Sequence, residues 1–126
     1  MNDDVNFGQG FPNTNVYDNQ CLTMYLFNIL GQKWKLPIIW YLAEKDTARY
    51  NELKRRIKGI TNIMLTKSLR ELEELNVIQR TQYNTIPPKV EYSLTESGKS
   101  LLPALSELNV WVGEHMKIDN IKKKEQ

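Results

Sequence analysis

The chain has 126 residues, of which 40% are apolar and 25% are charged, which is ordinary for a globular protein and sufficient for one domain with its own core. Its longest apolar run, residues 37–43, is too short to span a membrane, and a single cysteine and a single histidine are too few to form a zinc or iron site. The first residues lack the basic and apolar segments of a signal peptide, so we expect a cytoplasmic protein without metal or cofactor.

The formal net charge of +2 is distributed unevenly along the chain. Residues 49–70 contain seven basic residues and one acidic residue, Glu52, so this segment carries about +6 while the remaining residues sum to about −4. A positive segment within a slightly acidic chain is typical of a surface that binds a polyanion.

The N-terminal part of the chain predicts an arm followed by two helices. Residues 1–17 are rich in Asn, Gly and Asp and lack periodicity, which indicates a mobile arm. Asp18 or Asn19 can cap a first helix that ends at Gly31. Residues 33–44 predict a second helix, with a proline in its first turns, where a missing N–H costs least.

The basic segment predicts two short helices joined by a turn. The first helix spans residues 50–57, Gly59 and Ile60 make the turn, and Thr61 is the expected N-cap of a helix over residues 61–75. Three leucines of this last helix fall within about 60° of one another at 100° per residue and must face the core. They are Leu65, Leu69 and Leu72.

After residue 76 the periodicity changes to that of strands. Residues 77–83 are rich in β-branched and polar residues, and apolar and polar residues alternate over 90–95. A Pro-rich loop joins the two segments, which predicts a β-hairpin. Thr95 then caps a last helix, and residues 117–126 form a basic tail. We therefore expect one α+β, mostly α domain over residues 18–116.

Helix, helix, turn, helix and hairpin is the order of a winged helix-turn-helix domain, in which the second helix of the motif enters the major groove of DNA. On the outer face of that helix, Lys67 and Arg70 are expected to contact guanine or phosphate, and Asn62 and Thr66 a base or phosphate. Ile63 either contacts a thymine methyl group or packs under the first helices or the wing.

Other basic residues are candidates for phosphate contacts. Lys54 and Arg55 precede the turn, and Lys89 lies on the hairpin. The alternative for Lys67 and Arg70 is a solvated face on which glutamates four residues along are their partners.

The motifs assembled in this way resemble those of the HxlR-type winged-helix transcriptional regulators, which are related to the MarR group. The resemblance covers residues 21–112 and is carried by Cys21, Gly31-Gln32-Lys33-Trp34, Arg49-Tyr50-Asn51-Glu52-Leu53, Leu69-Arg70-Glu71-Leu72, Val77-Ile78-Gln79-Arg80, Pro87-Pro88-Lys89-Val90-Glu91-Tyr92-Ser93-Leu94-Thr95, Gly98 and Trp111. The chain departs from the family pattern at Leu22, where proline is common, at Tyr50, where phenylalanine is usual, and at Asn76, where glycine is common.

The resemblance implies a homodimer, built from the first and last helices, that binds a pseudo-palindromic operator. The terminal helices also carry more apolar side chains than a small monomer comfortably exposes, although a monomer with a thicker core is the alternative. The expected interface residues are Tyr25, Leu26, Leu108, Trp111 and Val112. Family members commonly control responses to electrophiles, oxidants or aldehydes.

Some members of this family sense oxidants through a cysteine that matches Cys21 and becomes disulfide-linked to the partner subunit. Its predicted place in the first turn of a helix favours the thiolate, whereas Asp18 opposes ionisation. The alternative is a small buried apolar side chain.

Three other functions are the alternatives to a redox-responsive DNA-binding regulator. The first is a regulator gated by a small hydrophobic ligand, with Trp34, Trp40, Tyr25 and Trp111 lining its pocket, and the second is a winged-helix module that binds proteins and not DNA. The third is an enzyme, which we do not expect, because His115 stands alone and no nucleophile has a placed base.

Overall fold

The computed structural model describes residues 22–116, which form five helices and one two-stranded antiparallel sheet. The elements are, in chain order, α1 (Leu22–Leu30), α2 (Lys35–Lys45), α3 (Tyr50–Arg56), α4 (Asn62–Glu74), β1 (Ile78–Tyr83), β2 (Lys89–Leu94) and α5 (Glu96–His115). The predicted winged helix-turn-helix with additional N- and C-terminal helices is confirmed. The arm over 1–17, the caps at Asp18 and Asn19, Cys21 and the tail over 117–126 lie outside the described residues.

The turn and the start of α4 in the helix-turn-helix are shaped by Gly59 and Thr61. Gly59 adopts a positive φ of 86° in the turn, which costs glycine little. Thr61 caps α4 as predicted, because its Oγ1 accepts a hydrogen bond from the backbone N of Met64 at 3.1 Å. α2 begins at Lys35, two residues later than predicted, after an N-cap residue, Trp34, that makes no side-chain hydrogen bond.

The core lies between α2, α3, α4 and the base of the hairpin. The three leucines predicted to face inward on α4 are all buried, and they pack in one cluster with residues of the other elements, including Ile38, Ile39, Leu42, Leu53 and Ile78. Burying an aliphatic side chain of this size contributes about 1.5–3 kcal/mol. This packing therefore fixes how α4 is presented to solvent.

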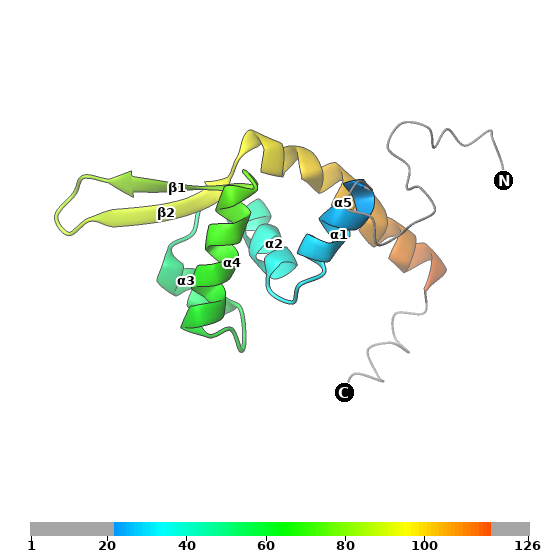
Figure 1. Cartoon of the computed structure of the whole chain (residues 1–126), viewed down its shortest axis with the longest axis horizontal. Coiled ribbons are helices and arrows are strands. Elements are labelled where there is room, and N and C mark those ends of the chain that lie inside the picture. The colour runs from blue at the N-terminus through cyan, green and yellow to red at the C-terminus, as the bar shows by residue number, and fades with distance from the viewer. Residues whose placement is uncertain (1–21, 117–126) are drawn as a thin grey trace.

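The hairpin, here called the wing, consists of β1, β2 and the loop over residues 84–88. Its register pairs Ile78 with Leu94 at the buried base and Tyr83 with Lys89 at the outer end. A short bridge attaches the wing to the segment before α3, since Ala48 and Tyr92 exchange backbone hydrogen bonds of 3.0 and 2.8 Å. In Figure 1 the wing extends from one end of the molecule, and α1 and the end of α5 lie at the other.

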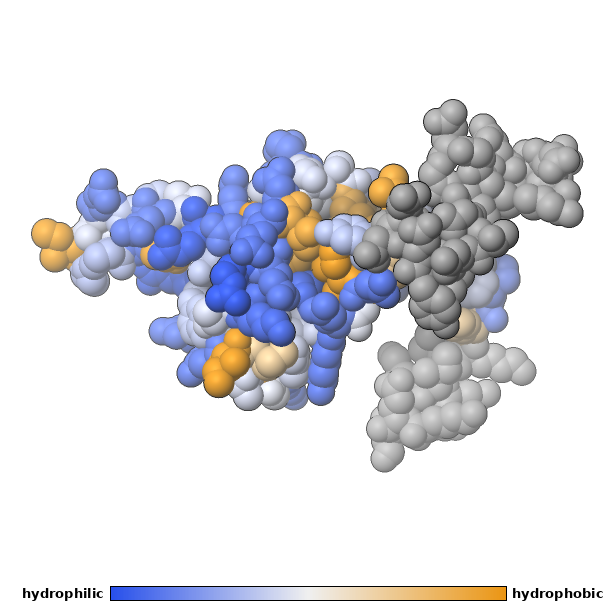
Figure 2. Space-filling view, viewed as in Figure 1, coloured by the Kyte–Doolittle hydropathy of each residue, from blue (hydrophilic) through white to orange (hydrophobic). Residues whose placement is uncertain are grey.

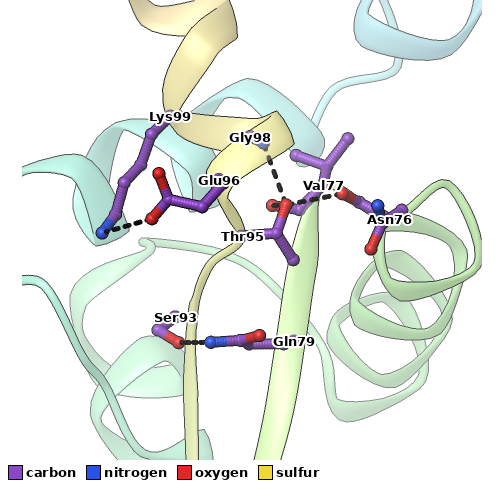
Figure 3. Close-up of polar contacts among 8 residues, drawn as sticks. All are labelled: Asn76, Val77, Gln79, Ser93, Thr95, Glu96, Gly98 and Lys99. Atoms are coloured by element: carbon purple, nitrogen blue, oxygen red, sulfur yellow. Dashed lines mark hydrogen bonds and ion pairs between the residues drawn. The ribbon is translucent and has the colours of Figure 1, made fainter.

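The start of α5 is bonded to the segment that follows α4 (Figure 3). Thr95 Oγ1 accepts from the backbone N of Gly98 at 2.9 Å and donates to the carbonyl of Asn76 at 2.6 Å. Asn76 takes the left-handed backbone conformation, with φ 62°. Glycine and asparagine are the residues that adopt this conformation most readily. A Cβ atom at Gly98 would lie 2.1 Å from the carbonyl oxygen of Val77. The junction of the wing, α4 and α5 therefore leaves no room for a side chain at Gly98.

Candidate nucleic-acid interface

The five residues proposed for the recognition helix lie together. Asn62, Ile63, Thr66, Lys67 and Arg70 are all exposed and line one shallow groove on the outer side of α4, opposite the buried leucines. We call this surface the recognition face. Its residues come from one continuous helix, so their relative positions are fixed by helical geometry and by the buried stripe behind them.

Ile63 is the apolar member of the recognition face. Its side chain is 78% exposed, so the alternative that it packs under the first helices or the wing is wrong. Figure 2 shows that hydrophilic and intermediate surface predominates in the region of α3 and α4, with little exposed apolar surface there. A single exposed isoleucine among donors is the arrangement that contact with a thymine methyl group requires.

Tyr50, the first residue of α3, connects this helix to the recognition face. Its Oη lies 3.1 Å from the carbonyl oxygen of Asn62, 3.2 Å from Asn62 Oδ1 and 3.1 Å from Thr66 Oγ1. Sequence reasoning did not include Tyr50 among the site residues. The available signal was its departure from the phenylalanine that is usual at this position in the family.

The two basic residues of the recognition face, Lys67 and Arg70, form no salt bridge with the acidic residues of the described part of the chain. Glu71 was a predicted partner of Lys67, but it instead forms an ion pair of 2.6 Å with Lys35 of α2. Within residues 22–116, neither Lys67 nor Arg70 forms a salt bridge. Both side chains are exposed to solvent, as the alternative of a solvated face expects, but the ion pairs with glutamates four residues along are not observed within residues 22–116.

The Lys35–Glu71 pair anchors α4 to α2 behind the recognition face. Lys35 is only 2% exposed and also donates a hydrogen bond to Oε1 of Gln32. The hydrogen bond from Lys35 holds the pKa of Glu71 below its usual value. Partial desolvation raises this pKa, whereas the charges of Lys67 and Arg70 lower it further. Glu71 therefore stays ionised at neutral pH and gives the buried ammonium group of Lys35 a partner of opposite charge.

The acidic residue of the basic segment, Glu52, is also engaged in a structural contact. Tyr41 donates a hydrogen bond from its hydroxyl to Glu52, and this bond lowers the pKa of Glu52 and raises that of Tyr41. Arg55 and Arg56 lower the pKa of Glu52 further, against desolvation. The contact joins α2 to α3, and it keeps this carboxylate away from the recognition face.

The candidate phosphate contacts occupy less uniform positions. Arg55 is exposed and lines a groove between α3 and the wing together with Pro87 and Pro88, whereas Lys54 is half-buried and lies outside that groove. Lys89 pairs with Glu91 at 3.4 Å and stands 5.1 Å from the centre of the Tyr83 ring. Of the three, Arg55 is therefore the best placed to meet a phosphate.

The apolar side chains assigned to a dimer interface are incompletely buried in a single chain. Tyr25 and Trp111 are each 49% exposed and Leu108 is 48% exposed, while Leu26 and Val112 are half-buried. In Figure 2, apolar surface gathers toward the end where α1 and α5 lie. Residues 22–116 of one chain therefore do not bury these five side chains completely.

The four aromatic residues considered for a ligand pocket lie apart. Trp40 lines a groove with Pro37 and Arg56, and Tyr25 lines another beside Lys35. Trp111 stacks on the ring of His115 with centroids 4.9 Å apart. The described residues of one chain thus provide no single pocket for these aromatics. None of the helices of the described part of the chain is both long and apolar enough to cross a membrane.

A winged helix-turn-helix with an exposed basic recognition face defines a protein of the transcriptional regulator class. The family model for the HxlR-like helix-turn-helix matches residues 29–120, and the chain belongs to this family.

Relatives and solved structures agree with this assignment. The HTH-type transcriptional regulator YkvN of Bacillus subtilis is 48% identical over 85 residues, 68% of this chain and 71% of YkvN. The HTH-type transcriptional regulator YdeP, also of Bacillus subtilis, is 43% identical over 105 residues, 83% of this chain and 80% of YdeP.

Two solved structures are similar over the same region. The reduced form of the transcriptional regulator YodB from B. subtilis gives a TM-score of 0.71 at 32% identity, over 77% of this chain and 95% of YodB. The redox regulator HypR in its oxidized form gives a TM-score of 0.67 at 36% identity, over 77% of this chain and 99% of HypR.

Proposed function

We propose that this protein is a cytoplasmic, sequence-specific DNA-binding regulator that acts as a homodimer on a pseudo-palindromic operator. The observation that carries the proposal is the recognition face, on which exposed polar side chains stand beside Lys67 and Arg70, neither of which has an acidic partner within the described residues. Lys67 and Arg70 contact guanine or phosphate, Asn62 and Thr66 contact a base or phosphate, and Ile63 contacts a thymine methyl group.

Residues around the recognition face contact the DNA backbone. Arg55 binds a phosphate beside the groove between α3 and the wing, with Lys54 in a lesser role because it is half-buried. Lys89 binds a phosphate from the wing after exchanging its contact with Glu91. Two copies related by a two-fold axis place two α4 helices about one helical turn apart along the duplex.

The binding test uses a random-core duplex library selected with the wild-type protein, followed by gel shifts on the enriched duplex across a salt series. We expect one preferred sequence with two related half-sites and an affinity that falls steeply with salt, because phosphate contacts release counterions. Lys67→Ala and Arg70→Ala should each weaken this complex by about 1–3 kcal/mol if the side chain reads a base.

The matched control is Lys99→Ala, which removes the same charge from an exposed lysine of α5 that pairs with Glu96. This variant should bind almost as tightly as the wild type. Equal losses for Lys67→Ala, Arg70→Ala and Lys99→Ala would reject the recognition face as the DNA contact. Absence of any enriched sequence would reject sequence-specific binding itself.

The effector proposed for this regulator is an oxidant or electrophile that acts on Cys21, a residue outside the described part of the chain. The support is the similarity to HypR, which is a redox regulator, and to YodB, whose structure is known in its reduced and diamide-treated forms. In the same gel shifts, diamide should change the operator affinity of the wild type and leave Cys21→Ser unaffected. Equal responses of the two proteins would exclude Cys21 as the sensor.

A further inference from the structure

The Tyr50 hydroxyl lies within hydrogen-bonding distance of three oxygen atoms of α4. It has one hydrogen and lies 3.1 and 3.2 Å from two acceptors, the carbonyl oxygen and Oδ1 of Asn62. Thr66 Oγ1 lies 3.1 Å from Tyr50 Oη, and either of these two hydroxyl groups can donate to the other. When Tyr50 donates to Asn62, Thr66 can donate its own hydrogen to Tyr50 Oη.

We propose that Tyr50 is a positioning residue that decides which hydrogen-bonding groups the recognition face offers to DNA. With Oδ1 held by Tyr50, Asn62 directs its Nδ2 donors outward. With its hydrogen used on Tyr50, Thr66 offers its methyl group and its oxygen lone pairs. Because the site it would tune is the proposed DNA contact, this inference rests on the proposed function.

The consequence is a definite base preference at the position that Asn62 reads. Donors alone suit acceptor groups in the major groove, which are N7 and O6 of guanine and O4 of thymine. The two-bond contact of asparagine with adenine needs both an amide donor and the amide oxygen. Oδ1 can accept a second hydrogen bond, but the contact with Tyr50 turns it toward α3 and away from the geometry that adenine needs, so the contact with adenine is disfavoured.

The Tyr50 side chain is held firmly enough to impose this orientation. The residue begins α3, its ring packs against the core cluster, and it also lines the groove between α3 and the wing. The hydroxyl can be removed without changing the ring, because phenylalanine differs from tyrosine only by the absence of that group. Tyr50→Phe is therefore expected to fold and to keep α3 in place.

The test compares duplexes selected from the random-core library by the wild type, Tyr50→Phe and Asn62→Ala. The position that loses its preference in Asn62→Ala is the one read by Asn62. There we expect the wild type to enrich guanine or thymine, and Tyr50→Phe to gain adenine by about fivefold or more relative to the wild type. Preferences that are lost in Arg70→Ala should be the same for the wild type and Tyr50→Phe.

Two controls separate positioning from a general structural effect. Tyr83→Phe removes another tyrosine hydroxyl, which bonds Glu91 on the wing at 3.2 Å, and should not alter the preference at the Asn62 position. Tyr50→Phe combined with Asn62→Ala should select the same duplexes as Asn62→Ala alone.

Three results would overturn the inference, and they are distinguishable. Identical base preferences for the wild type and Tyr50→Phe would overturn the role of Tyr50 while leaving the regulator intact. Unchanged selection by Asn62→Ala would show that Asn62 reads no base, which ends the inference but not the proposed function. Failure of the wild type to enrich any sequence would overturn both.

Discussion

At the scale of single residues, the most consequential contact behind the recognition face is between Lys35 and Glu71. It joins a buried ammonium group to a carboxylate at 2.6 Å, across 36 residues of sequence. Breaking such a pair costs more than the pair itself contributes, because the remaining buried charge loses its partner. The pair therefore makes the attachment of α4 to α2 dependent on pH.

The direction of that dependence follows from the pKa of Glu71, which the hydrogen bond from Lys35 lowers from its ordinary value of 4.5. A carboxyl group with a lowered pKa in the folded state stabilises that state above its ordinary pKa, and the contribution is lost as pH falls through the lowered value. We expect the free energy of unfolding to decrease with acid from about pH 5 downward. Glu71→Gln should flatten that decrease in urea unfolding measured at successive pH values.

A matched variant is Glu107→Gln, which removes an exposed carboxyl group from α5. Its unfolding free energy should depend on pH as that of the wild type does. If Glu71→Gln and the wild type lost stability in parallel with acid, the Lys35–Glu71 pair would have no role in acid sensitivity. Lys35→Met offers a second check, because an apolar side chain of similar length needs no carboxylate partner.

The orientation of individual side chains on α4 could be predicted from the sequence, whereas their partners could not. Helical geometry alone places Leu69 inward and Lys67 outward, as observed. The contacts of Tyr50 with Asn62 and of Lys35 with Glu71 join separate helices, so they depend on how these helices pack. No periodic pattern within one helix contains that information.

At the scale of elements, boundaries were predicted best where a side chain marks them. Thr61 and Thr95 cap α4 and α5 through hydrogen bonds to backbone N–H groups, and both helices begin at the following residue. The start of α2, which no side chain caps, was placed two residues early. The bridge between Ala48 and Tyr92 was not predicted, because it pairs distant segments of backbone.

The junction of α4, the wing and α5 permits a prediction about Gly98. Gly98→Ala puts a Cβ atom 2.1 Å from the backbone oxygen of Val77, which cannot move without shifting the base of the wing. Overpacking of this kind costs about 1–3 kcal/mol, and the displaced wing should also weaken DNA binding. Urea unfolding and gel shifts on the selected duplex measure the two effects.

Gly113 provides the control on the same helix. A Cβ atom at that position meets nothing within 4 Å, so Gly113→Ala should stabilise α5 by about 0.5–1 kcal/mol within the described chain. Equal stability of Gly98→Ala and the wild type would mean that the backbone at the junction can shift at little energetic cost. In that case α5 would not be rigidly coupled to the wing.

At the scale of the whole molecule, the two ends of the protein have different surfaces. The recognition face and the wing present mostly charged and polar groups, with Ile63 and Ile86 as exposed apolar exceptions, whereas most of the other exposed large apolar side chains lie on α1 and α5. Such a concentration of exposed apolar side chains is typical of an interaction site on a small protein. Because α5 starts at the junction with the wing, a dimer formed through α1 and α5 would fix the separation of two recognition faces.

That arrangement predicts linked losses of assembly and of operator binding. Leu108→Asp places a charge on a side chain that is 48% exposed in one chain and should convert a species of about twice 14.8 kDa into monomer. Affinity for the full selected duplex should fall strongly, because a monomer binds one half-site without a linked second subunit that binds the other. Affinity for an isolated half-site should change little. Sedimentation velocity and gel shifts on both duplexes measure these effects.

The control for Leu108→Asp is Ile86→Asp, which introduces the same charge at the fully exposed tip of the wing. We expect this variant to remain dimeric and to lose affinity for the full duplex and the half-site by similar factors, since the wing lies near DNA in each subunit separately. Dissociation by Ile86→Asp would indicate an interface through the wing. A wild type that sediments as a monomer while still selecting paired half-sites would show that DNA, rather than α1 and α5, brings the two copies together.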